Sequence, residues 1–229
     1  GASYLIASAS GSGIKTTMPV PFALNPYEGS PAYPTIPGAV QGWWSGPVVF
    51  RQTNEYGDNS FVGAADQYGH LITLLYDHKT NSIRRKNIAK WEPDDHNVPA
   101  FVQRLDKRII VAYARHALEN AIRYRISETA NCDDWGPEQT LVTSGTATYV
   151  QMFRQSSAIH LFYRVGASGS GGWCHRRSTD NGATWTAERI ILDTEYVLFV
   201  PTADASAFRA YCYQNPTSGT DHDIYYCSI

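Results

Sequence analysis

The sequence predicts an all-β protein, and three observations lead to this fold class. Short runs rich in Val, Ile, Tyr and Phe recur after Gly42, and turn residues bound each run. No long stretch has the 3.6-residue periodicity of an amphipathic helix; the best candidate, ARHALENAIRYR, is short and changes to a strand pattern. The strand-like runs also recur about every 50 residues, which is typical of a β-propeller.

Four strand-like runs mark the starts of the repeats. They are PVVFRQ at Pro47, PAFVQR at Pro99, YVQMFR at Tyr149 and YVLFVP at Tyr196, spaced by 52, 50 and 47 residues. A turn, a second strand-like run and a later third run follow each of them. We therefore expect about four blades of three to four antiparallel strands. The expected blades cover residues 43–93, 94–142, 143–193 and 194–229.

The segment STDNGATW, residues 178–185, fits the pattern S-x-D-x-G-x-T-W. It resembles the Asp-box, or BNR repeat, of sialidase-type propellers. We expect Asp180 to bond backbone amides of its own turn, Gly182 to supply an unusual φ and Trp185 to pack into the blade. A degraded version, SETANCDDW, stands in the preceding repeat. The motif therefore indicates a fold, and Asp180 is interpreted as structural.

Composition narrows the classes of partner. The formal net charge of −2 argues against nucleic acid, because no basic field covers the chain. No apolar run reaches the length of a membrane span. Aromatic residues make up 13% of the chain, which suits a β-rich protein or a carbohydrate-binding surface. The chain opens GASYLIASASGSG, without the basic region of a signal peptide, and we still expect a secreted or extracellular protein.

Two histidines, His96 and His116, flank the first hairpin of the second repeat. If this hairpin turns at Asp106 and Lys107, the residue numbers of any two paired positions add up to about 212. The numbers of His96 and His116 also add up to 212, so the two histidines face each other at the open end of the hairpin. The same reasoning places a residue pair at the open end of each later hairpin. A β-bulge in any of these hairpins would break the register.

In the third repeat the pair is Tyr149 and Arg164, and in the fourth it is Tyr196 and Tyr213. Because the inner strands of all blades run in one direction, these hairpin ends meet on one face around the central channel. The expected rim consists of Trp43, Trp44, His96, His116, Tyr149, Arg164, Tyr196 and Tyr213.

These residue types together suit β-elimination from a uronic-acid polysaccharide. Histidine is a general base near neutral pH, and tyrosine can donate or accept a proton. Arginine binds a carboxylate in a fixed fork and so acidifies the neighbouring C5 proton. Aromatic faces stack on sugar rings. The sequence therefore predicts a site that abstracts a proton, donates another and neutralises a carboxylate.

Several segments resemble the BNR-repeat family that includes the propeller-type ulvan lyases: GWWSGPVVF, DDHNVPAFV, YARH, the YVQ and LFYR pair, and DIYYCSI. The resemblance implies that His96 and Tyr149 act in proton abstraction and donation, and that His116 and Arg164 neutralise the uronate. It implies an anionic, ulvan-like polysaccharide as partner and no required cofactor or catalytic metal. The expected substrate-binding residues are Trp43, Trp44, Asn97, Arg115, Tyr196 and Tyr213.

Two alternatives remain open beside the lyase. The Asp-box suggests a sialidase-like glycoside hydrolase, but the arginine cluster and acid–tyrosine arrangement of such an enzyme cannot be placed. The aromatic rim would also suit a non-catalytic carbohydrate-binding propeller. A structural metal ion is a weaker possibility, with Cys174 and His175 as candidate ligands.

The first 42 residues are rich in Gly, Ser and Pro and are interpreted as an N-terminal arm or long loop. A strand-like run within it, residues 3–9, could close a ring of four blades. The family's lyases resemble seven-bladed propellers, however, so we favour the N-terminal part of a larger propeller. Such a chain would expose unpaired strand edges and tend to self-associate.

Overall fold

The structure is a computed structural model of the chain. It describes residues 45–46, 48–55, 57–132, 134–166, 171–193, 196–204, 206–213 and 224–228. The expected N-terminal arm, with the strand-like run at residues 3–9, lies outside the described residues, and so do Trp43 and Trp44. Within the described part of the chain, no helix combines the length and the hydrophobicity needed to span a membrane.

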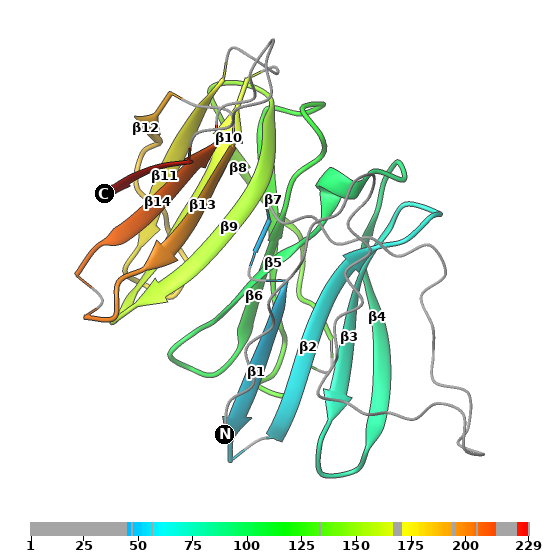
Figure 1. Ribbon diagram of the computed structural model, residues 1–229. Helices are drawn as coiled ribbons and strands as arrows, with labels where there is room; N and C mark the ends of the chain where they lie inside the picture. The colour runs from blue at the N-terminus through cyan, green and yellow to red at the C-terminus, as the bar shows by residue number, and fades with distance from the viewer. Residues whose placement is uncertain are drawn as a thin grey trace. The chain divides into compact units, whose positions relative to one another are not determined.

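The described residues form four antiparallel sheets, each built from strands consecutive in the chain (Figure 1). The first contains β1 (Val49–Asn54), β2 (Gly57–Ala65), β3 (His70–Asp77) and β4 (Ser82–Lys90). The second contains β5 (Ala100–Gln103), β6 (Ile109–Tyr113), β7 (Ala121–Ile126) and β8 (Gln139–Val142). The third contains β9 (Ala147–Gln155), β10 (Ala158–Val165), β11 (Gly172–Ser178) and β12 (Arg189–Leu192). The fourth contains β13 (Tyr196–Pro201), β14 (Phe208–Tyr213) and β15 (Ile224–Ser228).

Successive sheets pack face to face. The first strand of each sheet contacts the first strand of the next, so that β1, β5, β9 and β13 meet in chain order. Between the third and fourth sheets, Phe162 and Phe199 stack with centroids 4.1 Å apart. Both rings are buried, and each contributes about 1.5–3 kcal/mol relative to an exposed ring. This arrangement confirms the predicted all-β propeller with about four blades of three to four strands.

The hairpin registers agree with the sequence in the second and fourth sheets. Phe101 pairs with Val111 across β5 and β6, as a turn at residues 106–107 requires. Tyr196 pairs with Tyr213 across β13 and β14. Both predicted registers are confirmed, because these hairpins contain no irregularity between their paired residues.

The register predicted for the third sheet is wrong by one residue at its open end. Arg164 pairs with Thr148, and Tyr149 and Val150 together lie opposite Tyr163. This is a β-bulge in β9, and Tyr149 takes a left-handed conformation with φ of 58°. Bulges redirect the side chains of the strand that carries them. Tyr149 lies in the core between the third and fourth sheets and Val150 in the core facing the second sheet, and the bulge brings Ala147, three positions before Val150, into the same core as Val150.

The Asp-box forms the structural turn that its sequence predicts. The Ser178 hydroxyl donates to Asp180, and the backbone amides of Gly182 and Thr184 donate to Ser178 Oγ and Asp180 Oδ1. Hydrogen bonds from the Thr184 hydroxyl, the Thr184 amide and the Ser178 hydroxyl lower the pKa of Asp180 to about 2. Gly182 has φ of 81°, and a Cβ there would lie 2.4 Å from Ile110 Cδ1. Trp185 packs against the core between the second and third sheets, as expected.

A set of hydrogen bonds among tyrosine, glutamate and arginine side chains recurs in the second and third sheets, and sequence reasoning did not predict it. In the second sheet the Tyr113 hydroxyl donates to Glu138 and accepts from Arg125 Nε, at 2.8 and 3.1 Å. In the third sheet, Tyr163 makes the same bonds with Glu188 and Arg176, at 2.6 and 2.7 Å. Burial and the neighbouring glutamate raise the pKa of each tyrosine.

Candidate functional site

The site begins at the loop that leads into β5. Asp94 is the N-cap of a single turn of 3-10 helix, η1 (Asp95–Asn97), and has extended φ and ψ of −144° and 135°. Its side chain accepts a hydrogen bond from the His96 amide at 2.8 Å. Aspartate is a favoured N-cap because its carboxylate satisfies amides that have no partner inside the helix. The DDHN segment therefore folds locally in a way that brings the Asp94 carboxylate close to His96.

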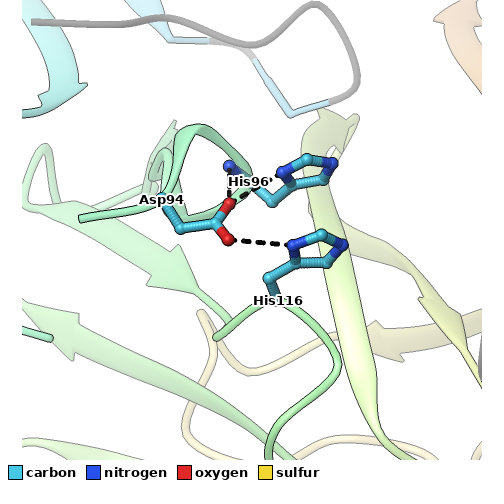
Figure 2. A group of neighbouring side chains, drawn as sticks. All are labelled: Asp94, His96 and His116. Carbon is cyan, nitrogen blue, oxygen red and sulfur yellow. Dashed lines mark hydrogen bonds and ion pairs between the residues drawn. The ribbon is translucent and has the colours of Figure 1, made fainter. Parts of the chain in front are cut away.

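The same carboxylate also reaches the second histidine. Asp94 Oδ1 lies 2.7 Å from His96 Nδ1, and Asp94 Oδ2 lies 2.9 Å from His116 Nδ1 (Figure 2). The imidazole rings stack with centroids 3.6 Å apart and planes 6° apart. His96 precedes β5 and His116 follows β6, so both histidines lie at the open end of the hairpin. The two histidines that the sequence predicts to face each other thus share one carboxylate.

Asn97 and Arg115 hold this arrangement from within the protein. Asn97 is fully buried; its Oδ1 accepts the His116 amide at 3.0 Å, and its Nδ2 donates to the Glu92 carbonyl. Arg115 forms ion pairs with Glu92 at 2.7 Å and with Glu119 at 3.1 Å. Both residues are predicted to contact the substrate, and no ligand here tests that prediction. In this structure their polar groups also place His116 and the loop before β5.

Tyr149 extends the cluster toward the third and fourth sheets. Its ring lies 5.3 Å from His96, 5.9 Å from Tyr196 and 6.3 Å from Trp173, measured between centroids. The Arg164 guanidinium lies over the Tyr149 ring, 5.8 Å from its centroid. The structure thus brings five predicted site residues together: His96, His116, Tyr149, Arg164 and Tyr196.

Two more aromatic residues, Trp173 in β11 and Tyr213 in β14, have to be placed relative to the predicted rim. Trp173, which sequence reasoning did not place near Tyr149, is fully buried in the core between the third and fourth sheets and supports the Tyr149 ring. Tyr213 is paired with Tyr196 through the backbone of β14, and its side chain lies outside the described residues.

Exposure divides the cluster into two layers. The His96 and His116 side chains keep 20% and 40% of their surface exposed. Tyr149 and Arg164 keep 2% and 3%. Partial burial of Asp94 is outweighed by hydrogen bonds from the His96 amide and both imidazoles, so its pKa is lowered and the carboxylate stays ionised. A ligand arriving from solvent would therefore meet the two imidazoles before Tyr149 and Arg164.

Donor atoms of Asp94, His96 and His116 lie within 4.8 Å of one another, as metal ligands would. The ring geometry does not fit a shared ion, however. A metal lies close to the plane of each imidazole that binds it, and two stacked planes 6° apart do not converge on one nearby point. The arrangement suits proton transfer better than metal ligation.

The suggested pair Cys174 and His175 does not form a metal site either. The two side chains point to opposite faces of β11, because neighbouring residues in a strand alternate. Cys174 lies in the core facing the second sheet, and burial raises the pKa of its thiol to about 12. His175 faces His160 instead, with His160 Nδ1 and His175 Nε2 3.0 Å apart beside a cavity of about 660 Å³.

Two solved structures have a similar fold. The first is a polysaccharide lyase, a PL25 ulvan lyase solved bound to -[GlcA(1-4)Rha3S]-, with a TM-score of 0.52 and 16% identity. The second is the catalytic domain of the Coprinopsis cinerea GH62 alpha-L-arabinofuranosidase, with a TM-score of 0.52 and 11% identity. Each likeness covers 84% of this chain, but only 48% of the lyase and 64% of the arabinofuranosidase. At these identities they show a shared fold and no more.

Among curated proteins, none matches this sequence. A family model does match, over residues 59–229, and is described as a BNR repeat-containing family member. The match spans most of the chain. It begins within β2 and includes the rest of the first sheet, the other three sheets and the Asp-box turn. The resemblance found in the sequence is thereby confirmed, and the chain belongs to the BNR repeat-containing family.

Proposed function

We propose that this protein is a polysaccharide lyase that cleaves an anionic, uronic-acid-containing polysaccharide such as ulvan by β-elimination. The observation that carries the proposal is the stacked pair His96 and His116, held by one carboxylate and placed beside Tyr149. A base, a proton donor and a cation within one cluster are the groups that elimination needs. The fold shared with an ulvan lyase supports the proposal.

In the proposed reaction, His96 Nε2 removes the C5 proton of the uronate. The electron pair of the C5–H bond forms the C4=C5 double bond while the bond from C4 to the leaving oxygen breaks. Tyr149 gives its hydroxyl proton to that oxygen. His116 and Arg164 balance the charge that develops on the carboxylate, an electrostatic contribution of about 3–4 kcal/mol for one such group in other enzymes. The proton on His96 then returns to solvent or to the tyrosinate.

The proposal places a requirement on substrate binding. His96 and His116 are accessible, whereas Tyr149 and Arg164 lie beneath them. A bound uronate must therefore approach across the exposed imidazole edges and reach the Tyr149 hydroxyl from that side. Sugar units on either side of the cleaved bond would supply the binding energy for this approach.

A hydrolase is less well supported by the described residues. A retaining glycosidase needs two carboxylates about 5 Å apart, one of them free to attack or to donate a proton. Here Asp94 is held by two imidazoles, and Glu92 and Glu119 are bound to Arg115. A non-catalytic carbohydrate-binding propeller would need no such charge arrangement.

The test is incubation of the protein with ulvan and other uronic-acid polysaccharides, following ultraviolet absorbance and new reducing ends together. Elimination gives both signals, because each cleavage leaves a conjugated C4=C5 uronate. New reducing ends without absorbance would identify a hydrolase. Binding to immobilised polysaccharide with neither signal would identify a carbohydrate-binding protein, and either of these results would overturn the lyase proposal.

A further inference from the structure

We propose that Asp94 is the positioning residue of the site, which fixes both histidines in one tautomer and turns both Nε2 atoms toward the substrate. The catalytic consequence rests on the proposed function, whereas the tautomers can be observed without any substrate. This task goes beyond the N-cap of η1, which Asp94 also provides.

The geometry divides the carboxylate between the two rings. Oδ1 serves His96 Nδ1, at 2.7 Å, and the His96 amide, at 2.8 Å. Oδ2 serves His116 Nδ1 at 2.9 Å. An ionised carboxylate only accepts hydrogen bonds, so each Nδ1 must carry the proton that it donates. In a neutral imidazole, a protonated Nδ1 leaves the lone pair on Nε2.

Stacking then sets the direction of the two lone pairs. The rings are nearly parallel, and Figure 2 shows both far nitrogens on the same side, away from Asp94. Tyr149 packs against the His96 ring of this pair. One carboxylate thus presents two basic nitrogens together beside the proposed proton donor. It also balances the positive charge that His96 gains when it takes a proton, as the aspartate of a catalytic triad does.

The neighbouring Asp95 does not perform the same task. Its Oδ1 lies 2.6 Å from His96 Nδ1, but half of its side chain is exposed. Among the ion pairs of the described residues, Asp95 contacts His96 alone, whereas Asp94 contacts both imidazoles. Asp94 also caps η1, so its position is fixed by the backbone.

The test uses nitrogen-15 NMR of the imidazole rings in the full chain, with His96→Gln and His116→Gln to assign the signals. In the wild type we expect both histidines to carry the proton on Nδ1. In Asp94→Asn, the amide group keeps one accepting oxygen and gains a donor. At least one ring must then move its proton to Nε2 or lose its hydrogen bond.

The matched control is Asp66→Asn. Asp66 accepts from the His70 amide at 2.9 Å and lies 3.1 Å from His70 Nδ1, an arrangement similar to that of Asp94 and His96 but in the first sheet. This variant should alter the His70 signals and leave those of His96 and His116 unchanged. Wild-type rings protonated on Nε2, or unchanged tautomers in Asp94→Asn, would overturn the proposal. The wild-type spectrum decides even if Asp94→Asn does not fold.

Activity supplies the second readout. We expect Asp94→Asn to lower kcat on the order of 10⁴-fold, as the same exchange does in a catalytic triad, with little change in KM. Asp94→Glu, which restores the charge with a longer reach, should recover part of the rate. Full activity of Asp94→Asn would contradict a positioning role. If the wild type produces no unsaturated product, the proposed function fails while the tautomer result still stands by itself.

Discussion

His96 and His116 stack face to face, with ring centroids 3.6 Å apart, although twenty positions separate them in the chain. The hairpin of β5 and β6 brings them together, and Asp94 holds both. Residues that act as a unit in catalysis are not additive when they are removed. We therefore expect the losses of activity from replacing His96 and His116 to be non-additive.

The first prediction concerns this non-additivity. His96→Gln should lower kcat at least about 10³-fold, because the proposed base is lost. His116→Gln should also impair turnover, and the double variant should be little worse than His96→Gln alone. A double-mutant cycle on kcat/KM measures this coupling. His70→Gln, which removes a histidine bonded to Asp66 in the first sheet, is the control and should keep full activity. Independent, additive losses would count against a shared site.

The second prediction separates two buried tyrosines. Tyr149→Phe keeps the ring that packs between His96 and Trp173 and removes the hydroxyl. We expect elimination to be abolished while polysaccharide binding changes little.

Tyr163→Phe is its counterpart. It removes the hydrogen bonds to Glu188 and Arg176, so it should lower the free energy of unfolding by about 1–3 kcal/mol and leave kcat unchanged. Chemical unfolding and single-turnover rates on both variants make the comparison. An active Tyr149→Phe enzyme would remove Tyr149 from the proposed chemistry.

The third prediction tests whether Arg164 binds the carboxylate of the substrate uronate. Arg164→Lys keeps a positive charge but not the planar fork, so kcat/KM on a uronate polysaccharide should fall at least tenfold. On the same polysaccharide with its carboxyl groups reduced, residual activity of wild type and variant should be equally low. Because Arg164 is buried, the melting temperature must be measured beside the rate. If the substitution slows both substrates by the same factor, Arg164 supports the fold and not the substrate carboxylate.

The fourth prediction concerns stability against pH. Burial first, and nearby positive charge second, lower the pKa of His160 and His175 from 6.5 to about 4. A pKa that is lower in the folded state means that protons bind the unfolded chain more tightly. The contribution of these neutral histidines to the free energy of unfolding is therefore fully present above about pH 6.5. It is lost as the pH falls toward about 4.

Urea unfolding at several pH values in this window measures the effect. His175→Phe, which removes one titrating ring beside Phe162, should flatten the dependence. Asp180 and Asp204, each with a pKa of about 2, add a separate loss at more acidic pH. An equal slope in His175→Phe and the wild type would refute this assignment.

The sequence predicts the sheets well because their strands and turns are local patterns. The hairpin at residues 106–107 is regular, so counting from its turn is enough to place His96 near His116. The bulge at Tyr149 is not visible in the same way, because a tyrosine gives no sign of a positive φ. Counting therefore errs by one residue at Arg164.

The roles of polar residues in the loop before β5 are harder to predict. The DDHN segment indicates a cap, but nothing in it shows that the Asp94 carboxylate also reaches a residue 22 positions later. Asn97 and Arg115 have the polar character of substrate-binding residues, and in the folded chain they also bind the His116 amide and Glu92. Such bonds depend on tertiary packing, which one sequence does not display.

The candidate site takes its residues from three different sheets. Asp94 and the histidines flank the second sheet, Tyr149 and Arg164 belong to the third, and Tyr196 begins the fourth. Such a site cannot be transplanted to another scaffold as a loop, because no single segment contains it. It would also be sensitive to any change that lets one sheet slide against its neighbour, even where every side chain of the cluster is kept. Evolution or engineering of this chain can therefore adjust the proposed chemistry by altering the packing between sheets, far from the residues to which that chemistry is assigned.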